Sequence, residues 1–445
     1  MSATLVRESA QRLDPLERLE ALCDPGTLQV LRSRVVSPRL GARSVPGDGV
    51  LGGTGCVNGR PIACYAEDGS YLGGSLGERH ADTIVRVLQT AERARIPVVA
   101  FVESGGARMQ EGTAALAGYG RIFRQTVGLT GVVPQISVVS GSSAGGGAYS
   151  PALTDLIIMT EDAAMFLTGP GVVHEALGEE ISAIELGGPR VHEHNGVCHL
   201  VEPVGPEIDD PGSVVPFESR RVYDVRDALG GIVDAGSLIE LCPRWARNVV
   251  TTLARIEGRP VGIVANQPRH LAGVLDAEGS EKAARFVSFC NSFGLPLIAV
   301  VDTPGFMPGS RQERAGVIRH GASLVRAFAA ARVPKLTLVL RKSYGGAYIT
   351  MNSRDLGADL VLAWPEAELG IMSARAAVGV VHRRELHAAE DAEALRLQLA
   401  DEYAAEHLRA EAAAASGFVD ELVEPADTRA RLAGALWTLC GSRLT

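Results

Sequence analysis

The chain contains an internal duplication, and this feature limits the folds open to it more than any other. The segment Gly59-Arg60-Pro61 recurs as Gly258-Arg259-Pro260, and the run 97–106 recurs as 296–305, at a nearly constant separation. The repeated unit is far larger than the short repeats that stack into solenoids. We therefore expect a duplicated domain and not an array.

The repeat divides the chain into two domains of the same architecture. We predict an N-terminal domain over residues 1–215 and a C-terminal domain over residues 216–445, with a linker in Pro203–Pro216, which is rich in Pro, Asp and Gly. In each half, continuous apolar runs typical of buried parallel strands alternate with amphipathic helices. The expected strands are 97–103, 136–140, 296–302 and 336–340, and the expected helices are 79–94, 280–293 and a long C-terminal one, 388–415. This alternation predicts the α/β class, with helices packed on a mostly parallel sheet.

Charge and cysteine usage exclude several kinds of partner. The net charge is −9, which argues against a nucleic-acid partner. The seven cysteines never form a C-x-x-C pair, so we expect neither a disulfide framework nor a zinc ribbon. His192, His194 and His199 lie close together without the spacing of a metal site, and we interpret them as a polar surface loop. Neither a signal peptide nor a membrane span is apparent, so we expect a soluble cytoplasmic protein with no membrane partner and no metal.

Each half carries a glycine cluster between an apolar strand and a helix. The clusters are Gly141–Tyr149 and Ser343–Tyr348. Glycine lets a ligand approach the backbone closely, and the first amides of a helix have no partner within the helix. The glycines either allow close packing of helix and strand or form two oxyanion holes, one for each of two carbonyl groups. Their repetition in both halves favours the oxyanion holes.

A second pair of loops, 103–112 and 302–309, follows the preceding strands, where open α/β sheets bind ligands. Arg108 in the first loop either contacts a phosphate or pairs with Glu111, and the sequence leaves both alternatives open. No G-x-S-x-G, Walker A or H-E-x-x-H motif is present. The pattern indicates chemistry in which the reactants bring their own base and nucleophile, while the protein supplies position and charge stabilisation.

At these loops the sequence resembles the biotin-dependent carboxyltransferase family, which comprises the β subunits of acetyl-, propionyl- and related acyl-CoA carboxylases. The resemblance extends from about Asp14 to Val423. Its main carriers are LGGSLGE at Leu72–Glu78, SGGARMQEG at Ser104–Gly112, GGGAYSPALTD at Gly145–Asp155, DTPGFMPG at Asp302–Gly309 and YGGAYITMNS at Tyr344–Ser353. It implies two tandem crotonase-like domains, each a ββα-superhelix, that arose by internal duplication.

The resemblance also implies roles for individual residues. The acyl-CoA would lie on the N-terminal domain of one subunit, and biotin on the C-terminal domain of a neighbour. Gly145 and Gly146 would hold the thioester oxygen as it becomes an enolate, and Gly346 and Ala347 would hold the ureido oxygen of biotin. The residues that would border the two ligands are Ser104, Gly105, Gly106, Ala107 and Arg108 for coenzyme A, and Tyr344 and Gly345 for biotin. The family reaction needs no protein base, because carboxybiotin releases carbon dioxide and the freed nitrogen takes the α-proton.

Partners and substrate follow from the same resemblance. The biotin would be covalently attached to a biotin carboxylase/biotin carboxyl carrier (α) subunit, and the chain would assemble as a homo-hexamer, a trimer of dimers. Ser142-Ser143 replaces the usual Pro-Cys of the family, and the segment after Gly196–Val201 is shortened by a helix. Ile349 stands where many propionyl-preferring members have Asp, and we expect it to shape the acyl pocket. We expect acetyl-CoA as substrate, with propionyl-CoA next.

Two other functions remain open. One is a decarboxylase or transcarboxylase subunit with the same fold, and the other is a scaffold that has kept the fold but lost turnover.

Overall fold

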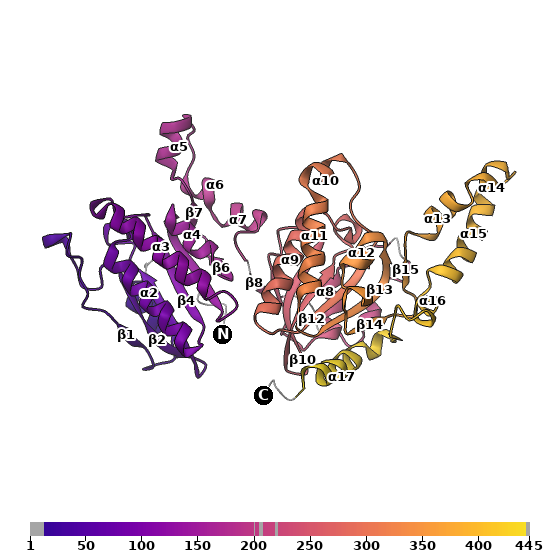
Figure 1. Ribbon diagram of the computed structural model, residues 1–445, viewed down its shortest axis with the longest axis horizontal. Coiled ribbons are helices and arrows are strands. Elements are labelled where there is room, and N and C mark those ends of the chain that lie inside the picture. Colours follow the sequence, from indigo (N-terminus) through magenta and orange to yellow (C-terminus); the bar gives the residue numbers. More distant parts are fainter. Residues whose placement is uncertain (1–12, 200, 204–207, 219–220, 442–445) are drawn as a thin grey trace. The chain divides into compact units, whose positions relative to one another are not determined.

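The apolar runs of the sequence form the centres of two sheets in the computed structural model, which describes residues 13–199, 201–203, 208–218 and 221–441 (Figure 1). The four predicted strands are confirmed as β4 (Val98–Ser104), β5 (Gln135–Ala144), β12 (Leu297–Thr303) and β13 (Lys335–Tyr344). The chain separates into two units, residues 1–200 and 201–445. The predicted α/β class is therefore confirmed.

The first unit is built on a seven-stranded sheet with the order β1-β2-β3-β4-β5-β6, and β7 pairs with β5. The first three strands are antiparallel, and the pairs from β3 to β7 are parallel. Helices α2 and α3 cover one face, and α1 covers the other. The remaining bounds are β1 (Gln29–Leu31), β2 (Val50–Val57), β3 (Arg60–Glu67), β6 (Leu156–Met159), β7 (Ala164–Phe166), α1 (Pro15–Leu22), α2 (Glu78–Ala94), α3 (Thr113–Gly128) and α4 (Gly146–Ala152).

The second unit repeats this plan on a nine-stranded sheet with the order β16-β14-β13-β12-β11-β10-β9-β8, and β15 pairs with β13. Helices α8 and α17 cover one face with a large apolar core. Helix α9 covers the other face, where Cys290 and Phe286 approach Gly262 of β11. The bounds are β8 (Val201–Pro203), β9 (Ile239–Leu241), β10 (Val249–Ile256), β11 (Arg259–Asn266), β14 (Leu360–Ala363), β15 (Glu368–Gly370), β16 (Glu421–Leu422), α8 (Val225–Ile232), α9 (Ala277–Ser292), α10 (Ser310–Ala315), α11 (Val317–Ala330), α12 (Gly345–Thr350) and α17 (Thr428–Cys440).

The duplication extends to individual side-chain contacts. Asp24 accepts hydrogen bonds from two amides of the β2–β3 turn at 2.9 and 2.7 Å, and Asp234 does the same at the β10–β11 turn at 2.8 and 2.7 Å. Gln135 and Lys335 begin β5 and β13, and each donates to a carbonyl in the last turn of the preceding helix, at 3.0 and 2.9 Å. The two halves thus share the side-chain hydrogen bonds that fix these turns and helix ends.

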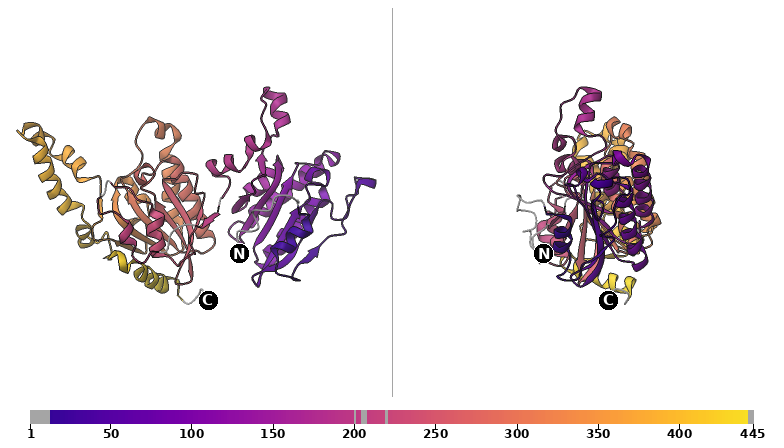
Figure 2. Two further views of the ribbon diagram at one scale, coloured as in Figure 1. Left: turned by 180° about the vertical axis from the view of Figure 1, so that it is seen from behind. Right: turned by 90° about the vertical axis from the view of Figure 1, so that its left-hand side faces the viewer.

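A helical segment follows β7 in the first unit and β15 in the second, and it extends beyond the sheet (Figure 2). The segments comprise α5 (Pro170–Leu177), α6 (Ala183–Gly187) and α7 (Pro189–Asn195) in the first unit, and α13 (Ala374–Val381), α14 (Arg383–Ala388), α15 (Ala392–His407) and α16 (Ala410–Ala415) in the second. The single helix predicted over 388–415 is therefore wrong. It is interrupted because the carbonyl of Leu408 accepts from Leu369 at 2.8 Å, and the amide of Ala410 donates to Ala367 at 2.9 Å.

The segment predicted as a linker is structured where the structure describes it. Strand β8 pairs with β9, and a 3-10 helix follows at Pro211–Val214, whereas residues 204–207 lie outside the described part. The sequence placed the domain boundary at 215/216, and the structure divides the chain at 200/201.

Candidate active site: two glycine-led helix starts

The loops that follow β4 and β12 are held in the same way in the two units. Leu76 donates to the carbonyl of Gly106 at 2.8 Å and accepts from the amide of Arg108 at 2.9 Å. In the second unit, Leu275 donates to Gly305 at 3.0 Å and accepts from Met307 at 2.7 Å. Each loop therefore forms a short parallel β-bridge with an earlier turn of its own unit, at the carboxyl end of the parallel strands.

Arg108 is the buried anchor of the first loop. Its side chain is 0% exposed, and its Nη1 lies 2.6 Å from Asp48 Oδ1 and 2.9 Å from Glu111 Oε1. Its Nη2 donates to the carbonyls of Asp48 and Ser75 at 3.2 and 2.9 Å. Of the two alternatives that the sequence left open, the structure contains the ion pair with Glu111. In this arrangement the guanidinium faces the protein interior and not solvent, and it ties its loop to Asp48 and Ser75.

The other residues predicted at coenzyme A differ in their access to solvent. Ser104 is buried, and its hydroxyl donates to the carbonyl of Gly74 at 3.1 Å. Gly105 is exposed, although its amide donates to Gly73 at 2.9 Å. Gly106 is buried and Ala107 is half-buried. Of the five residues predicted at coenzyme A, only Gly105 and Ala107 are therefore accessible to a ligand at this loop.

The first glycine cluster turns sharply into helix α4. Gly145 precedes the helix with φ 57° and ψ −120°, a conformation that side-chain-bearing residues rarely adopt. Its amide donates to the carbonyl of Phe166 at 3.0 Å, as a continuation of the pairing between β5 and β7. Gly146 is the first residue of α4, where an amide has no partner within the helix. Of the two residues predicted at the thioester oxygen, Gly145 thus has its amide engaged within the sheet, and Gly146 lies where the helix leaves amides without a partner.

The second cluster begins helix α12 with Gly345, Gly346 and Ala347. Gly345 has φ 60°, Gly346 is exposed, and Ala347 is fully buried. The preceding residue, Tyr344, is buried and hydrogen-bonded to Glu368 of β15. Burial, together with the neighbouring carboxylate of Glu368, raises the pKa of Tyr344. The phenol is therefore a fixed structural link between β13 and β15.

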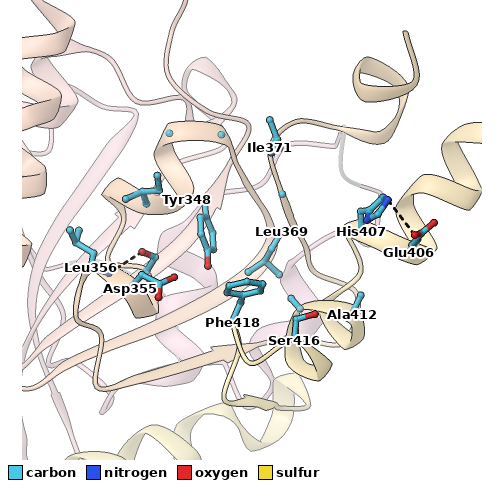
Figure 3. Close-up of a pocket in the computed structure, with 16 residues that line it drawn as sticks. Tyr348, Asp355, Leu356, Leu369, Ile371, Glu406, His407, Ala412, Ser416 and Phe418 are labelled. Atoms are coloured by element: carbon cyan, nitrogen blue, oxygen red, sulfur yellow. Dashed lines mark hydrogen bonds and ion pairs between the residues drawn. The ribbon is translucent and has the colours of Figure 1, made fainter. Parts of the chain in front are cut away.

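A pocket of about 740 Å³ opens in the second unit beside α12, β15 and α16 (Figure 3). Three residues predicted from the sequence, Gly345, Gly346 and Ile349, line it together. Its other apolar lining residues include Leu369, Ile371 and Phe418, and its polar ones are Ser353, Asp355, Glu406, His407 and Ser416. Tyr344 and Ala347, the other two residues predicted in this half, are buried and do not line the pocket.

Sequence reasoning missed the far wall of this pocket. Ile371 follows β15 as Leu167 follows β7, so the repeat itself could have identified Ile371. Phe418 and His407 gave no such signal, because only the break between α15 and α16 turns this part of the chain toward the pocket.

A buried carboxylate lies just before the loop in each unit. Glu103 pairs with Arg18 of α1 at 3.0 Å. At the equivalent position, Asp302 accepts from Arg341 at 2.8 Å and from the hydroxyl of Tyr223 at 2.9 Å. A buried charge is stable only with a partner, so each carboxylate must keep its arginine. These ion pairs thereby fix the carboxyl ends of β4 and β12.

The three neighbouring histidines do not form the predicted surface loop. His192 and His194 lie on helix α7, and His192 Nε2 is 2.8 Å from the carbonyl of Met165. The ring of His199 accepts from the amide of Ile157 at 3.2 Å. Within the described residues, no three His, Cys, Asp or Glu side chains gather as metal ligands, and no helix is long and apolar enough to cross a membrane.

Comparison with known proteins gives consistent matches over nearly the whole chain. The family model described as a carboxyl transferase domain matches twice, at residues 8–204 and 201–440. The chain is 43% identical over 465 residues to the methylmalonyl-CoA carboxyltransferase 12S subunit of Propionibacterium freudenreichii subsp. shermanii, with 96% of this chain and 89% of that protein covered. It is 42% identical over 468 residues to the biotin-dependent acetyl-/propionyl-coenzyme A carboxylase beta6 subunit of Mycobacterium tuberculosis, with 98% and 96% covered.

A solved structure agrees with these sequence matches. The transcarboxylase 12S crystal structure with methylmalonyl-coenzyme A and methylmalonic acid bound matches with a TM-score of 0.91 at 41% identity, covering 97% of this chain and 90% of that one.

Proposed function

Because this chain belongs to the carboxyl transferase family, we propose that it moves a carboxyl group between biotin on a partner protein and the α-carbon of a short acyl-CoA. The observation that carries this proposal is the pair of glycine-led helix starts, α4 and α12, at equivalent places in the two units. Two such starts offer backbone donors to two carbonyl oxygens, which is what the two reactants require.

In the first unit, the amide of Gly146 would donate to the thioester oxygen of the acyl-CoA. Negative charge grows on this oxygen when the α-carbon loses its proton, and a fixed donor stabilises that charge more than it stabilises the neutral thioester. Gly145 would shape the turn, since its own amide is bonded to Phe166. Gly105 and Ala107 would border coenzyme A, and Arg108 would hold their loop through Asp48 and Glu111.

In the second unit, the pocket beside α12 fits a biotin headgroup. Gly346 and Ala347 lie in the first turn of α12, where amides lack partners within the helix, and apolar side chains line the pocket next to them. Their amides would donate to the ureido oxygen, and Tyr344 and Gly345 would set the turn. Carboxybiotin supplies, when bound, both the carboxyl group and the nitrogen that takes the α-proton.

For the acyl group we propose propionyl-CoA, carboxylated to methylmalonyl-CoA, ahead of acetyl-CoA. This reverses the order expected from the sequence, because two relatives are named for methylmalonyl- or propionyl-CoA alone, and a third is named for acetyl- and propionyl-CoA together. Ile349 is 51% exposed beside the pocket proposed for biotin, so the additional methyl group of a propionyl-CoA held by a neighbouring subunit would meet an apolar surface there. A single methylene discriminates only weakly, so acetyl-CoA should remain a slower substrate.

We further propose that the chain works as a homo-hexamer with a biotin-carrying α subunit. The support is the similarity to the 12S transcarboxylase structure, which is described as a hexamer assembly, and to a β subunit of a biotin-dependent carboxylase. A role as a transcarboxylase subunit is the second candidate, since the 12S protein is 43% identical.

An assay with a purified biotinylated partner tests the proposal. With ATP, bicarbonate and a biotin carboxylase, we expect carboxylation of propionyl-CoA faster than of acetyl- or butyryl-CoA. Transfer from methylmalonyl-CoA to the carrier, without turnover in the forward assay, would favour the transcarboxylase. Binding of coenzyme A esters without any transfer in either direction would leave only the scaffold and refute the proposal.

A further inference from the structure

Tyr119 lies beneath both loops of the candidate acyl-CoA site in the first unit. It projects from α3, is 5% exposed, and its ring backs Gly146: a Cβ added to that glycine would lie 2.8 Å from the ring. Its hydroxyl is 2.9 Å from Ser104 Oγ at the end of β4. Ser104 in turn packs against Gly147, whose added Cβ would lie 2.7 Å from the Cβ of Ser104. One side chain therefore joins the two strand ends that carry the site.

The direction of the hydrogen bond follows from its neighbours. A serine hydroxyl has one hydrogen, and the carbonyl of Gly74 accepts it at 3.1 Å, so Tyr119 donates to Ser104. Burial raises the pKa of Tyr119, and the charge of Glu67 adds to this, so the phenol keeps its proton. The ring is also in contact with Phe123, at 5.7 Å between centroids. Tyr119 is thus held at both the ring and the hydroxyl.

We propose that Tyr119 is a positioning residue for carboxyl transfer, which fixes the amide of Gly146 where the thioester oxygen becomes negative. The inference rests on the function proposed above. An oxyanion donor is effective only when its position is set before the reaction, because reorganising it during the reaction would consume part of its benefit. The Tyr119 ring is the surface on which the first residue of α4 lies, so the position of this residue depends on where the ring is held.

The second unit has no such tyrosine beneath Gly346. The ring that faces Gly346 is Phe306, from the loop after β12, and its nearest atom is 3.5 Å from an added Cβ. Phenylalanine has no hydroxyl with which to link the two strand ends. A loss of the Tyr119 hydroxyl should therefore affect the acyl-CoA half-reaction and leave the biotin half-reaction intact.

The test is the variant Tyr119→Phe in the full chain with its biotinylated partner and propionyl-CoA. We expect kcat to fall about tenfold and the KM for propionyl-CoA to stay within about twofold, because only a hydrogen bond that orients the donor is removed. Tyr65→Phe is the matched control, since Tyr65 is also 5% exposed in the same core and lies on β3. It should keep the wild-type kcat.

A second variant, Ser104→Ala, removes the acceptor and should lower kcat in the same way, even if Tyr119→Phe folds poorly. The double variant should be no slower than Ser104→Ala alone, because both changes break one link. Wild-type kcat in Tyr119→Phe, or losses that multiply in the double variant, would overturn the inference. An inactive wild-type protein would instead refute the proposed function itself.

Discussion

At the scale of single residues, glycines that look equivalent in the sequence differ in what lies beneath them. Gly146 rests on the ring of Tyr119, which leaves no space for a Cβ, whereas Gly346 faces Phe306 at an ordinary contact distance and lines the open pocket. The sequence predicted one role for both positions. The structure shows that the packing beneath the two glycines differs, whereas the role proposed for their amides is the same.

This difference gives a paired prediction. We expect Gly146→Val and Gly346→Val both to abolish carboxyl transfer, the first by displacing the donor and the second by filling the pocket beside it. Only Gly146→Val should also be less stable, by about 1–3 kcal/mol, because its side chain overpacks against Tyr119. Turnover assays and thermal unfolding of both variants check this, and near-normal turnover in either would contradict the assignment.

Ile349 supports a prediction about substrate choice. Ile349→Asp places a charge on the apolar wall of the pocket proposed for biotin, where the tail of a longer acyl group held by a neighbouring subunit would otherwise gain contact. We expect kcat/KM for butyryl-CoA to fall about tenfold more than that for acetyl-CoA. If the ratios among acetyl-, propionyl- and butyryl-CoA do not change, Ile349 does not contact the acyl group.

At the scale of elements, the strands of the parallel core could be predicted because they are continuous apolar runs with buried neighbours on both faces. The antiparallel hairpin β2–β3 and its counterpart β10–β11 gave no comparable signal. The break between α15 and α16 could not be predicted either, since the local sequence is rich in Ala, Glu and Leu and favours one helix. The hydrogen bond between Leu408 and Leu369 of β15 overrides that preference. The residues that follow the break then line the far wall of the pocket.

The junction of β5 and β6 should respond to pH. Asp155 accepts from the amide of Gln135 at 2.8 Å, and burial raises the pKa of Asp155 to about 6 in the folded protein, from an unfolded value of 3.8. A carboxyl group with a raised folded pKa stabilises the fold below its unfolded pKa, and this stabilisation is lost as the pH rises through the folded pKa. Between pH 4 and 6, the free energy of unfolding should therefore fall for this reason.

Asp155→Asn should remove that fall, because the amide still accepts the hydrogen bond but does not ionise. We expect the melting temperature of the variant, relative to wild type, to rise between pH 4.5 and pH 7. Asp162→Asn, which alters an exposed carboxylate in the same unit, is the control. If the difference in melting temperature between Asp155→Asn and wild type is constant across this range, the pKa of Asp155 is not raised by burial.

At the scale of the whole molecule, the duplicated plan was visible in the sequence because repeated motifs keep their order and spacing. The division of labour between the halves came from the family resemblance, since nothing in the repeat itself says which half holds which ligand. The inward orientation of Arg108 toward Asp48, and the engaged amide of Gly145, needed the structure, because both depend on neighbours distant in the chain.

Hydrogen exchange can test this division of labour. Propionyl-CoA should protect amides in the loop 104–112 and in α4 of the first unit, and a biotin amide should protect amides in α12 and β15 of the second. Strands β3 and β11 serve as internal references, because their hydrogen exchange should not change with either ligand. Protection of the second unit by coenzyme A alone would reverse the assignment of the halves.

Helix α3 supplies the aromatic ring beneath the first glycine, and a loop supplies the one beneath the second. The two copies of the ancestral gene segment have therefore come to rely on different parts of their own sequence for the same support. A mutation in the aromatic support of the proposed acyl-CoA site therefore changes no equivalent residue in the proposed biotin site. Selection could alter the range of acyl groups in this way while the biotin site stays the same.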